Sequence, residues 1–318
     1  MTALGALPRV VFVLGKGGVG RTTIATALGT ALARRGKRVL VFEWTLSETI
    51  APWFELPSVG IDPCEVAPLL WAANFRLDDS LRAYFVDHLR MGAFYRHVVD
   101  GRAVRRLVRA APGIAEMMFL GHLCWLTTLA EKEAGLRFDH VLVDAPATGH
   151  GAALLDLPAT LAPMHASGLL GAELNRVGEM MRDPHWTGAI AVSLPEELAV
   201  EETLELVPRA AKSLGRPLLA VVVNRSTARL VTDDAAPAWL ESLRSRVPPQ
   251  VASALEGVEA ELRARLRFER ELRQKLGSAT PGGIVALDEQ LARVGEHSPR
   301  AVVAALASAF ETEIAGGA

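Results

Sequence analysis

Cysteine is nearly absent from this chain. Its 318 residues include only Cys64 and Cys124, which lie far apart in the sequence. Neither belongs to a C-x-x-C pair, so a single chain cannot build a structural zinc clasp or a redox-active pair from them. We expect both residues to serve as small, buried apolar side chains.

An excess of charge of one sign and a long hydrophobic run are also missing. The net charge is −2 at pH 7, which gives no global attraction to nucleic acid or to anionic lipid. No apolar run approaches the ~20 residues that span a bilayer. The first residues lack the basic start and apolar core of a signal peptide. We therefore expect a cytoplasmic protein with no nucleic-acid partner and no integral membrane segment.

The most informative feature that is present is a glycine-rich segment directly after the apolar run Val10–Leu14. A helix is expected to open at about Thr22. A strand, a loop and a helix in this order direct several backbone N–H groups at one point, which suits a phosphate. The spacing G-x-x-x-x-G-[K/R]-T is that of a nucleotide-binding P-loop, with arginine in place of the usual lysine. The residues expected to bind nucleotide are Gly15, Lys16, Gly17, Gly18, Val19, Gly20, Arg21, Thr22 and Thr23.

The hydrophobic pattern of the whole chain predicts an α/β fold. Continuous apolar strands joined through helices indicate a doubly wound, mostly parallel sheet. Between about 62 and 133 helical periodicity dominates and no convincing strand is found. We therefore predict one domain, residues 1–318, with a helical insertion at about 62–133, and charged, solvated helices at 236–276. Buried strands are expected at 10–14, 38–43, 140–144, 188–193, 217–223 and 283–287.

A second motif begins at the end of the strand 140–144. An aspartate at the carboxyl end of a strand beside the P-loop strand can orient Mg²⁺-bound water, although many strands end this way. Here Asp144 opens the run D-A-P-A-T-G-H, which ends at His150, and L-L-D-L-P follows at 154–158. With the P-loop, these motifs resemble the ArsA family of arsenical-pump ATPases and ATPases that target tail-anchored membrane proteins.

The resemblance covers residues 9 to about 225, and two later stretches agree with it. L-P-E-E-L at 194–198 resembles a helix start of the family, and V-V-V-N ends at Asn224. The resemblance implies ATP or ADP with Mg²⁺ as ligands and a nucleotide-sandwich dimer. By matching position, Asn224 would contact the adenine.

Other roles follow from the same resemblance, again by matching position. Thr22 and Asp144 would hold Mg²⁺, with Asp144 as the Walker B aspartate. Lys16, directly after the first glycine, marks the deviant form of the P-loop and would reach the nucleotide of a dimer partner. Gly149 and His150 would belong to switch II.

Two departures from the family pattern affect catalysis. Arg21 replaces the P-loop lysine, and a planar guanidinium does not act as a compact point charge. Thr45 stands where the family carries the switch I aspartate that orients the attacking water, so much of the hydrolytic rate should be lost. Glu43 is a candidate substitute, although strand alternation makes its fit doubtful. The adenine-side loop of the family is also hard to find at 287–290.

The helical insertion would be the surface for a protein client in this family. Methionine-rich surfaces adapt to varied apolar partners, but ordinary helix packing is the stronger interpretation because half of the chain is apolar. A basic cluster at Arg102, Arg105, Arg106 and Arg109 is interpreted as a solvated helix face. The candidate client residues are Met91, Phe94, Tyr95, Met117, Met118, Phe119, Leu120, Leu123 and Trp125.

These observations lead to one main hypothesis. The chain would be an ArsA-like ATPase homologue that binds ATP, hydrolyses it weakly, and acts as a homodimer or with an intact ArsA-like paralogue to move or target a protein client. Its candidate catalytic residues are Lys16, Glu43 and Asp144. Two cysteines do not supply a thiolate cluster for arsenite.

Two other hypotheses remain. The chain would be a non-hydrolysing nucleotide-binding partner subunit, or a positioning ATPase of the ParA/MinD type, which shares the deviant P-loop. The Thr-Gly-His motif at 148–150 and the helical insertion argue against the second of these.

Overall fold

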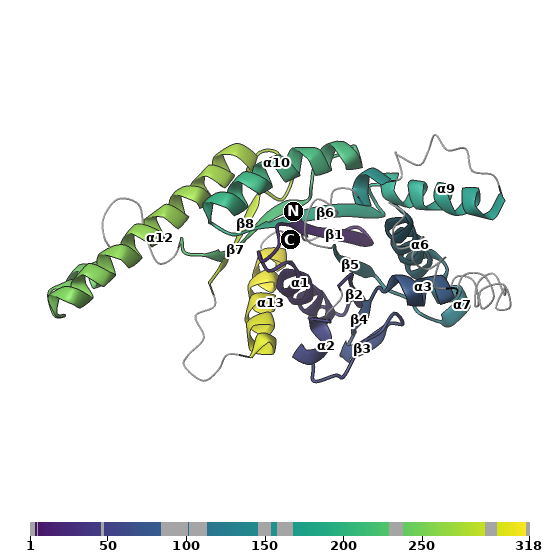
Figure 1. Ribbon diagram of the computed structural model, residues 1–318, viewed down its shortest axis with the longest axis horizontal. Coiled ribbons are helices and arrows are strands. Elements are labelled where there is room, and N and C mark those ends of the chain that lie inside the picture. Colours follow the sequence, from purple (N-terminus) through teal and green to yellow (C-terminus); the bar gives the residue numbers. More distant parts are fainter. Residues whose placement is uncertain are drawn as a thin grey trace.

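The computed structural model describes residues 4, 6–45, 48–83, 101, 113–145, 154–157, 168–228, 238–289 and 298–315. At its centre lies an eight-stranded sheet with the order β3-β4-β2-β5-β1-β6-β7-β8 (Figure 1). Neighbouring strands run parallel, except that β3 is antiparallel to β4. The strands are β1 Val10–Gly15, β2 Val39–Glu43, β3 Cys64–Ala67, β4 Leu70–Asn74, β5 His140–Asp144, β6 Thr187–Ser193, β7 Ala220–Ser226 and β8 Ile284–Asp288.

Helices cover both faces of this sheet, as expected for a doubly wound fold (Figure 1). Alternate residues of a strand point to opposite faces. In β1, Val11 and Val13 therefore pack with α1, α2 and α13, whereas Val10 and Phe12 pack with α6, α9, α10 and α12. The helices are α1 Arg21–Arg34, α2 Ile50–Trp53, α3 Leu77–Ala83, α6 Ile114–Thr128, α7 Ala130–Ala134, α9 Gly168–Arg182, α10 Glu197–Leu214, α11 Ala238–Arg244, α12 Pro249–Leu276 and α13 Pro299–Ala315.

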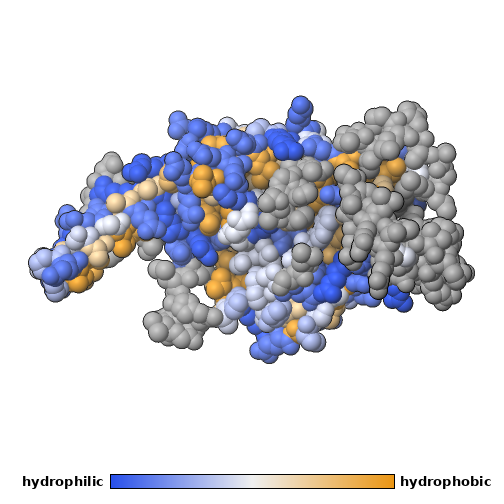
Figure 2. Space-filling view, viewed as in Figure 1, coloured by the Kyte–Doolittle hydropathy of each residue, from blue (hydrophilic) through white to orange (hydrophobic). Residues whose placement is uncertain are grey.

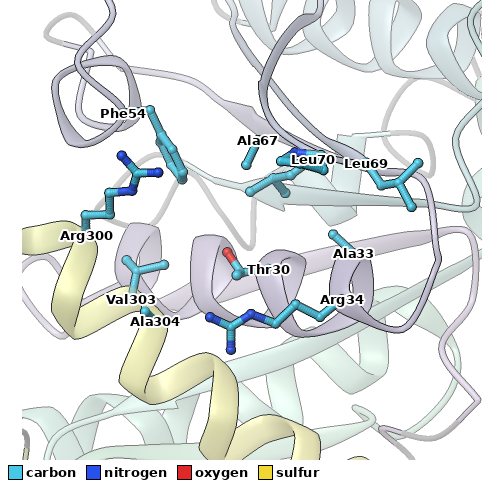
Figure 3. A pocket seen from close by; sticks show the side chains of 11 residues that line it. Thr30, Ala33, Arg34, Phe54, Ala67, Leu69, Leu70, Arg300, Val303 and Ala304 are labelled. Carbon is cyan, nitrogen blue, oxygen red and sulfur yellow. The ribbon is translucent and has the colours of Figure 1, made fainter.

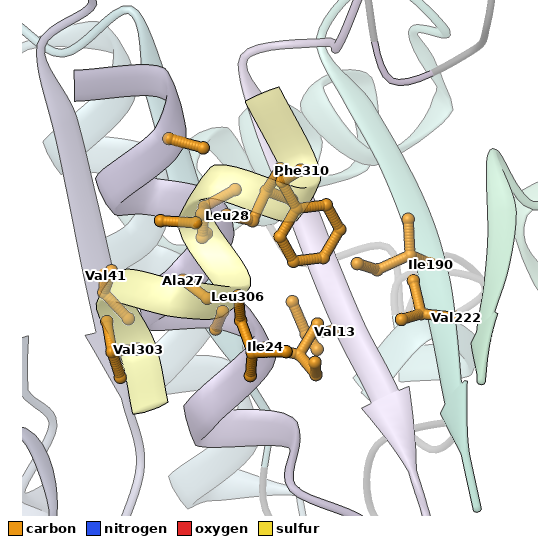
Figure 4. Packing of buried hydrophobic residues seen from close by; sticks show 14 of the residues in the cluster. Val13, Ile24, Ala27, Leu28, Val41, Ile190, Val222, Val303, Leu306 and Phe310 are labelled. Carbon is orange, nitrogen blue, oxygen red and sulfur yellow. The ribbon is translucent and has the colours of Figure 1, made fainter. Parts of the chain in front are cut away.

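The helix after the P-loop is held by the carboxyl-terminal helix. Helix α13 packs against α1, and together they bury Phe310 and Leu306 with Ile24 and Leu28 of α1 (Figure 4). Phe310 is fully buried. Segments almost 300 residues apart in sequence therefore form one core layer beneath the P-loop strand.

The expectation that no strand lies between 62 and 133 is wrong. Residues 64–74 form the hairpin β3–β4, and β4 pairs in parallel with β2. The sequence signal for these strands was weak, because β3 has only four residues and its pairing with β4 shifts register between Glu65 and Ala67. Strand β4 contains two alanines, which have low strand propensity. The helical part of the insertion begins at α3.

Within the described part of the insertion, α6 supports the packing interpretation. Phe119, Leu120 and Leu123 are buried in the core, whereas Met117, Met118 and Trp125 are half-buried. The candidate client residues Met91, Phe94 and Tyr95 lie outside the described residues, as do Arg102, Arg105, Arg106 and Arg109. Among the helices that are described, none has the length and apolar character needed to cross a membrane.

The charged helices expected at 236–276 are present as α11 and α12. Helix α12 extends beyond the sheet, and hydrophilic side chains cover much of it (Figures 1 and 2). Its carboxyl-terminal half buries Leu272 and Leu276. The projecting half exposes Val251 and Val258, so the expectation of a solvated face holds for most of the helix but not for these two side chains.

Candidate functional site

The glycine-rich loop connects β1 to α1 at the carboxyl edge of the sheet. Strand β1 lies between β5 and β6. The next strands along the chain, β2 to β4, lie on the β5 side of β1, whereas β6 to β8 lie on its other side, so the strand order reverses at β1. Crevices at such reversals are where open α/β sheets bind ligands. Helix α1 begins at Arg21 with no side chain capping its first turn. Its first N–H groups are therefore available to an anion, as the sequence predicted.

The position of Gly20 requires glycine for two reasons, its backbone conformation and a close neighbouring side chain. Its φ of +90° is unfavourable for residues with a Cβ. A Cβ built there would lie 2.4 Å from Nδ2 of Asn224. That same Nδ2 donates to the carbonyl of Val19 at 2.9 Å, and the Asn224 Oδ1 accepts from the N–H of Arg225 at 3.0 Å. Asn224 therefore braces the loop from the end of β7, and its contact with adenine stays a prediction.

Thr22 and Asp144 come together where the sequence predicted a metal site. The hydroxyl of Thr22 donates to Oδ2 of Asp144. Burial raises the pKa of Asp144, while the Thr22 hydroxyl and the charge of Arg21 act in the opposite direction. Oδ1 of Asp144 is buried and makes no hydrogen bond with any residue that the structure describes. A buried carboxylate oxygen with spare acceptor capacity beside a threonine hydroxyl fits a hydrated Mg²⁺ ion.

Arg21 points toward the end of β5, where Asp144 is the predicted Walker B aspartate. Its guanidinium donates to the backbone carbonyl of Ala145, directly after Asp144. Burial lowers the pKa of Arg21 and the charge of Asp144 raises it. Part of the donor capacity that a P-loop lysine would direct at phosphate is therefore used within the protein. The predicted switch II residues Gly149 and His150 lie outside the described residues.

The segment after β2 is fastened to the sheet at several points. Asn74, fully buried at the end of β4, accepts from the N–H of Thr45 at 3.2 Å and donates to its carbonyl at 3.1 Å. Glu43 is also fully buried, and both of its carboxylate oxygens lie 3.4 Å from the N–H of Thr49. Thr45, the residue predicted to replace the switch I aspartate, is thus held by two hydrogen bonds of its backbone.

Farther along the same segment, Glu48 forms a third connection. Its carboxylate accepts from the N–H of Val59 at 3.0 Å and from the hydroxyl of Ser58 at 2.9 Å, and it pairs with Arg76 at 2.8 Å. These contacts lower the pKa of Glu48 even though its burial acts in the opposite direction. The segment is therefore tied to β4 and to the loop before β3.

Lys16 makes an ion pair within its own chain. Its Nζ lies 2.9 Å from Oε1 of Glu202 on α10, and both side chains are partly exposed. The side chain is therefore directed at α10 in the single chain. Exposed pairs of this kind contribute only about 0–1 kcal/mol, so the contact is easily exchanged for another.

The sequence predicted the glycine loop and Asp144 as site residues, but it did not indicate the contacts of Asn74, Glu202 and Glu48 that support them. Asn74 could have been recognised as a polar residue ending a buried strand if β4 had been identified. Glu202 lies in the helix-start motif of the resemblance, but its pairing with Lys16 could not be read from the sequence. Glu48 carries no local signal, because its partners lie at least ten residues away.

We predict that Gly20→Ala weakens nucleotide binding by at least about tenfold. The added Cβ meets Asn224 and must adopt a positive φ, which costs on the order of 1–3 kcal/mol. Calorimetric titration with ADP measures the affinity. The matched control is Gly36→Ala, which carries the same strain at φ +81° with no atom within 4 Å. An equal loss of affinity in both variants would rule out the role of the Asn224 contact.

We also predict that Glu43 destabilises the fold as the pH rises. Burial raises its pKa from 4.5 to about 7, and the charges of Asp144 and Glu48 add to this, whereas the N–H groups of Thr49 and Ile50 oppose it. Between these two pKa values the unfolded chain releases the proton while the folded chain retains it, so stability falls.

Denaturant unfolding at pH 5 and pH 8 tests this prediction. Glu43→Gln removes the titration and should reduce the loss of stability over this interval by about 2–3 kcal/mol. Exposed Glu256 provides the control variant Glu256→Gln. An unchanged pH dependence in Glu43→Gln would show that Glu43 is ionised in the fold.

Comparison with known proteins agrees with this geometry. The family model described as anion-transporting ATPase matches residues 8–167. The chain is 30% identical over 256 residues to the ATPase BagA of Mycobacterium tuberculosis, covering 78% of this chain and 70% of that protein. It is 23% identical over 238 residues to ATPase ASNA1 homolog 1 of Paramecium tetraurelia, covering 64% and 70%. An arsenical pump-driving ATPase of Escherichia coli is 29% identical over 170 residues, covering 50% and 27%. The chain therefore belongs to the anion-transporting, ArsA-type ATPase family.

Proposed function

We propose that this chain binds ATP with Mg²⁺ and hydrolyses it slowly, as one subunit of a dimer that moves or targets a protein client. The observation that carries the slow rate is the pair of contacts between Asn74 and the backbone of Thr45, at 3.2 and 3.1 Å. They hold an uncharged residue at the family's switch I position. No carboxylate is therefore supplied there to orient the attacking water.

Nucleotide binding is supported by the open N-terminus of α1 and by the loop that Asn224 braces. When bound, Mg²⁺ would neutralise charge that develops on the phosphates. Thr22 and Asp144 would hold it, the first through its hydroxyl and the second through the unpartnered Oδ1. The Arg21 guanidinium donates to the Ala145 carbonyl, so it would share its donors between that carbonyl and the phosphates.

Glu43 is the remaining candidate for a catalytic carboxylate. Its Cα is paired in register with that of Asp144, so it lies at the correct edge of the sheet. However, both of its oxygens face the N–H of Thr49, and its pKa of about 7 leaves it half protonated at neutral pH. We therefore infer that Glu43 stabilises the segment after β2 and orients water poorly.

A non-hydrolysing partner subunit is the second candidate. It is favoured by the contacts that Thr45 makes with Asn74 and that Glu48 makes with Ser58 and Arg76, because these contacts would have to break if the segment after β2 moved during hydrolysis. A test of turnover separates the two candidates.

We predict that the double variant Arg21→Lys/Thr45→Asp hydrolyses ATP faster than the wild-type chain, by on the order of 10²-fold. The restored carboxylate orients water, and the restored lysine reaches the phosphates. Single-turnover hydrolysis with Mg²⁺ measures the effect. The matched control is Arg21→Lys/Thr45→Asn, which keeps the shape of the aspartate without its charge. Wild-type turnover of ~1 s⁻¹ or faster would contradict the proposal.

We also propose that Lys16 acts on the nucleotide of the dimer partner, because its pair with Glu202 is exposed and weak. In a mixture with an intact ArsA-like paralogue, Lys16→Ala should lower the paralogue's rate by on the order of 10²-fold, as loss of a transition-state charge does. Glu202→Gln should leave that rate the same or raise it.

Calorimetry and steady-state ATP turnover measure the two effects of Lys16→Ala. The chain's own affinity for nucleotide should change little. An unchanged rate in the Lys16→Ala mixture, with association intact, would leave Lys16 with a role in its own chain only.

A further inference from the structure

A cavity of about 320 Å³ lies between α1, α13 and the turn that joins β3 to β4 (Figure 3). We propose that it binds a small aliphatic carboxylate, whose chain fills the cavity and whose head group pairs with Arg300. The binding and hydrolysis of ATP make no use of this cavity. The proposal is therefore independent of the proposed function.

The walls of the cavity suit an aliphatic chain. Phe54, Leu69 and Leu70 line one side, and Val303 of α13 faces them from the other (Figure 3). Leu70 and Val303 are almost completely buried, whereas Phe54 and Leu69 are half-buried. Ligand cavities in proteins range from about 300 to 1,000 Å³, so a volume near the lower limit indicates a small ligand.

Two arginines supply the charge at the cavity. Arg34 already lies 3.8 Å from Glu311 and donates to the hydroxyl of Ser308 at 3.2 Å. The guanidinium carbon of Arg300 lies 5.7 Å from the ring centre of Phe54, and Arg300 makes no ion pair within the described residues. The carboxylate of Glu311 offsets one of the two guanidinium charges, which leaves one net positive charge at the cavity. A monoanion therefore matches the cavity better than a dianion.

The chemistry of Arg300 favours a carboxylate as that monoanion. A guanidinium can donate two parallel hydrogen bonds to a carboxylate. Helix α13 begins at Pro299, so the positive end of its dipole lies beside this head group. Ser298 accepts the N–H of Ala301 at 3.1 Å. The helix would therefore attract the carboxylate mainly through its dipole, whereas Arg300 would donate the hydrogen bonds to it.

The cavity is separate from the P-loop. Thr30, on its wall, lies about 12 Å along α1 from Thr22, at 1.5 Å rise per residue. The β3–β4 turn precedes β4, at the amino edge of the parallel strands, opposite the edge that carries Asp144. Both sites nevertheless share α1 as a wall.

Titration of the full chain with octanoate tests the proposal, with 1-octanol as the uncharged probe and octyl phosphate as the dianionic one. We expect saturable one-to-one binding of octanoate, at least about tenfold tighter than binding of either other probe. Arg300→Gln should weaken octanoate binding about tenfold through loss of the charged pair. Arg35→Gln is the matched control, because Arg35 follows Arg34 in sequence but does not line the cavity, and it should change nothing.

A second variant tests the cavity itself. Ala304→Trp, on the half-buried face of α13, should fill the space and abolish binding of octanoate and octanol alike. Equal affinity for octanol and octanoate, no saturable octanoate binding, or full affinity in Arg300→Gln would overturn the proposal. Tighter binding of octyl phosphate would overturn the assignment of a monoanion. Arg300 is exposed, so its substitution leaves the fold intact and the test interpretable.

Discussion

The arrangement of the P-loop and the carboxyl end of β5 depends on one buried carboxyl group, that of Asp144. A carboxylate removed from water is costly unless its charge is offset by partners. Here the partners come from α1, whose Thr22 hydroxyl and Arg21 guanidinium both lie at the end of β5. Because α1 also packs against α13, the P-loop cannot shift without disturbing a polar contact and a core layer together.

The segment after β2 illustrates how this chain differs from the pattern it resembles. Thr45, at the position predicted to match a water-orienting carboxylate, is held through its backbone by Asn74. The nearby carboxylates of Glu43 and Glu48 accept backbone N–H groups of the same chain. These polar groups therefore form hydrogen bonds within the chain and hold the backbone after β2 in place.

Local patterns predicted the parts of the fold that depend on local physics. The run at 140–144 has three consecutive apolar residues before its terminal Asp144, and β5 has those same bounds. The hairpin β3–β4 was missed, because its strands are short, contain alanines and have an irregular register, and tertiary pairing with β2 stabilises them.

The candidate functional site was likewise predictable from the sequence only in part. Glycine spacing and Asp144 could be read from the sequence, but the partners of Lys16, Thr45 and Glu48 could not. Those partners lie on other elements, and neither spacing nor periodicity indicates which elements will be neighbours. The cavity beside α13 was likewise hidden, because its walls come from four separate segments.

The irregular pairing of β3 has a consequence for how copies of this protein can meet. An exposed edge strand offers a row of backbone donors and acceptors to any other chain. Strand β3 is short, runs antiparallel to its neighbour, and loses register between Glu65 and Ala67. It is also flanked by Pro63 and Pro68, which supply no backbone N–H. This edge therefore resists sheet-to-sheet polymerisation.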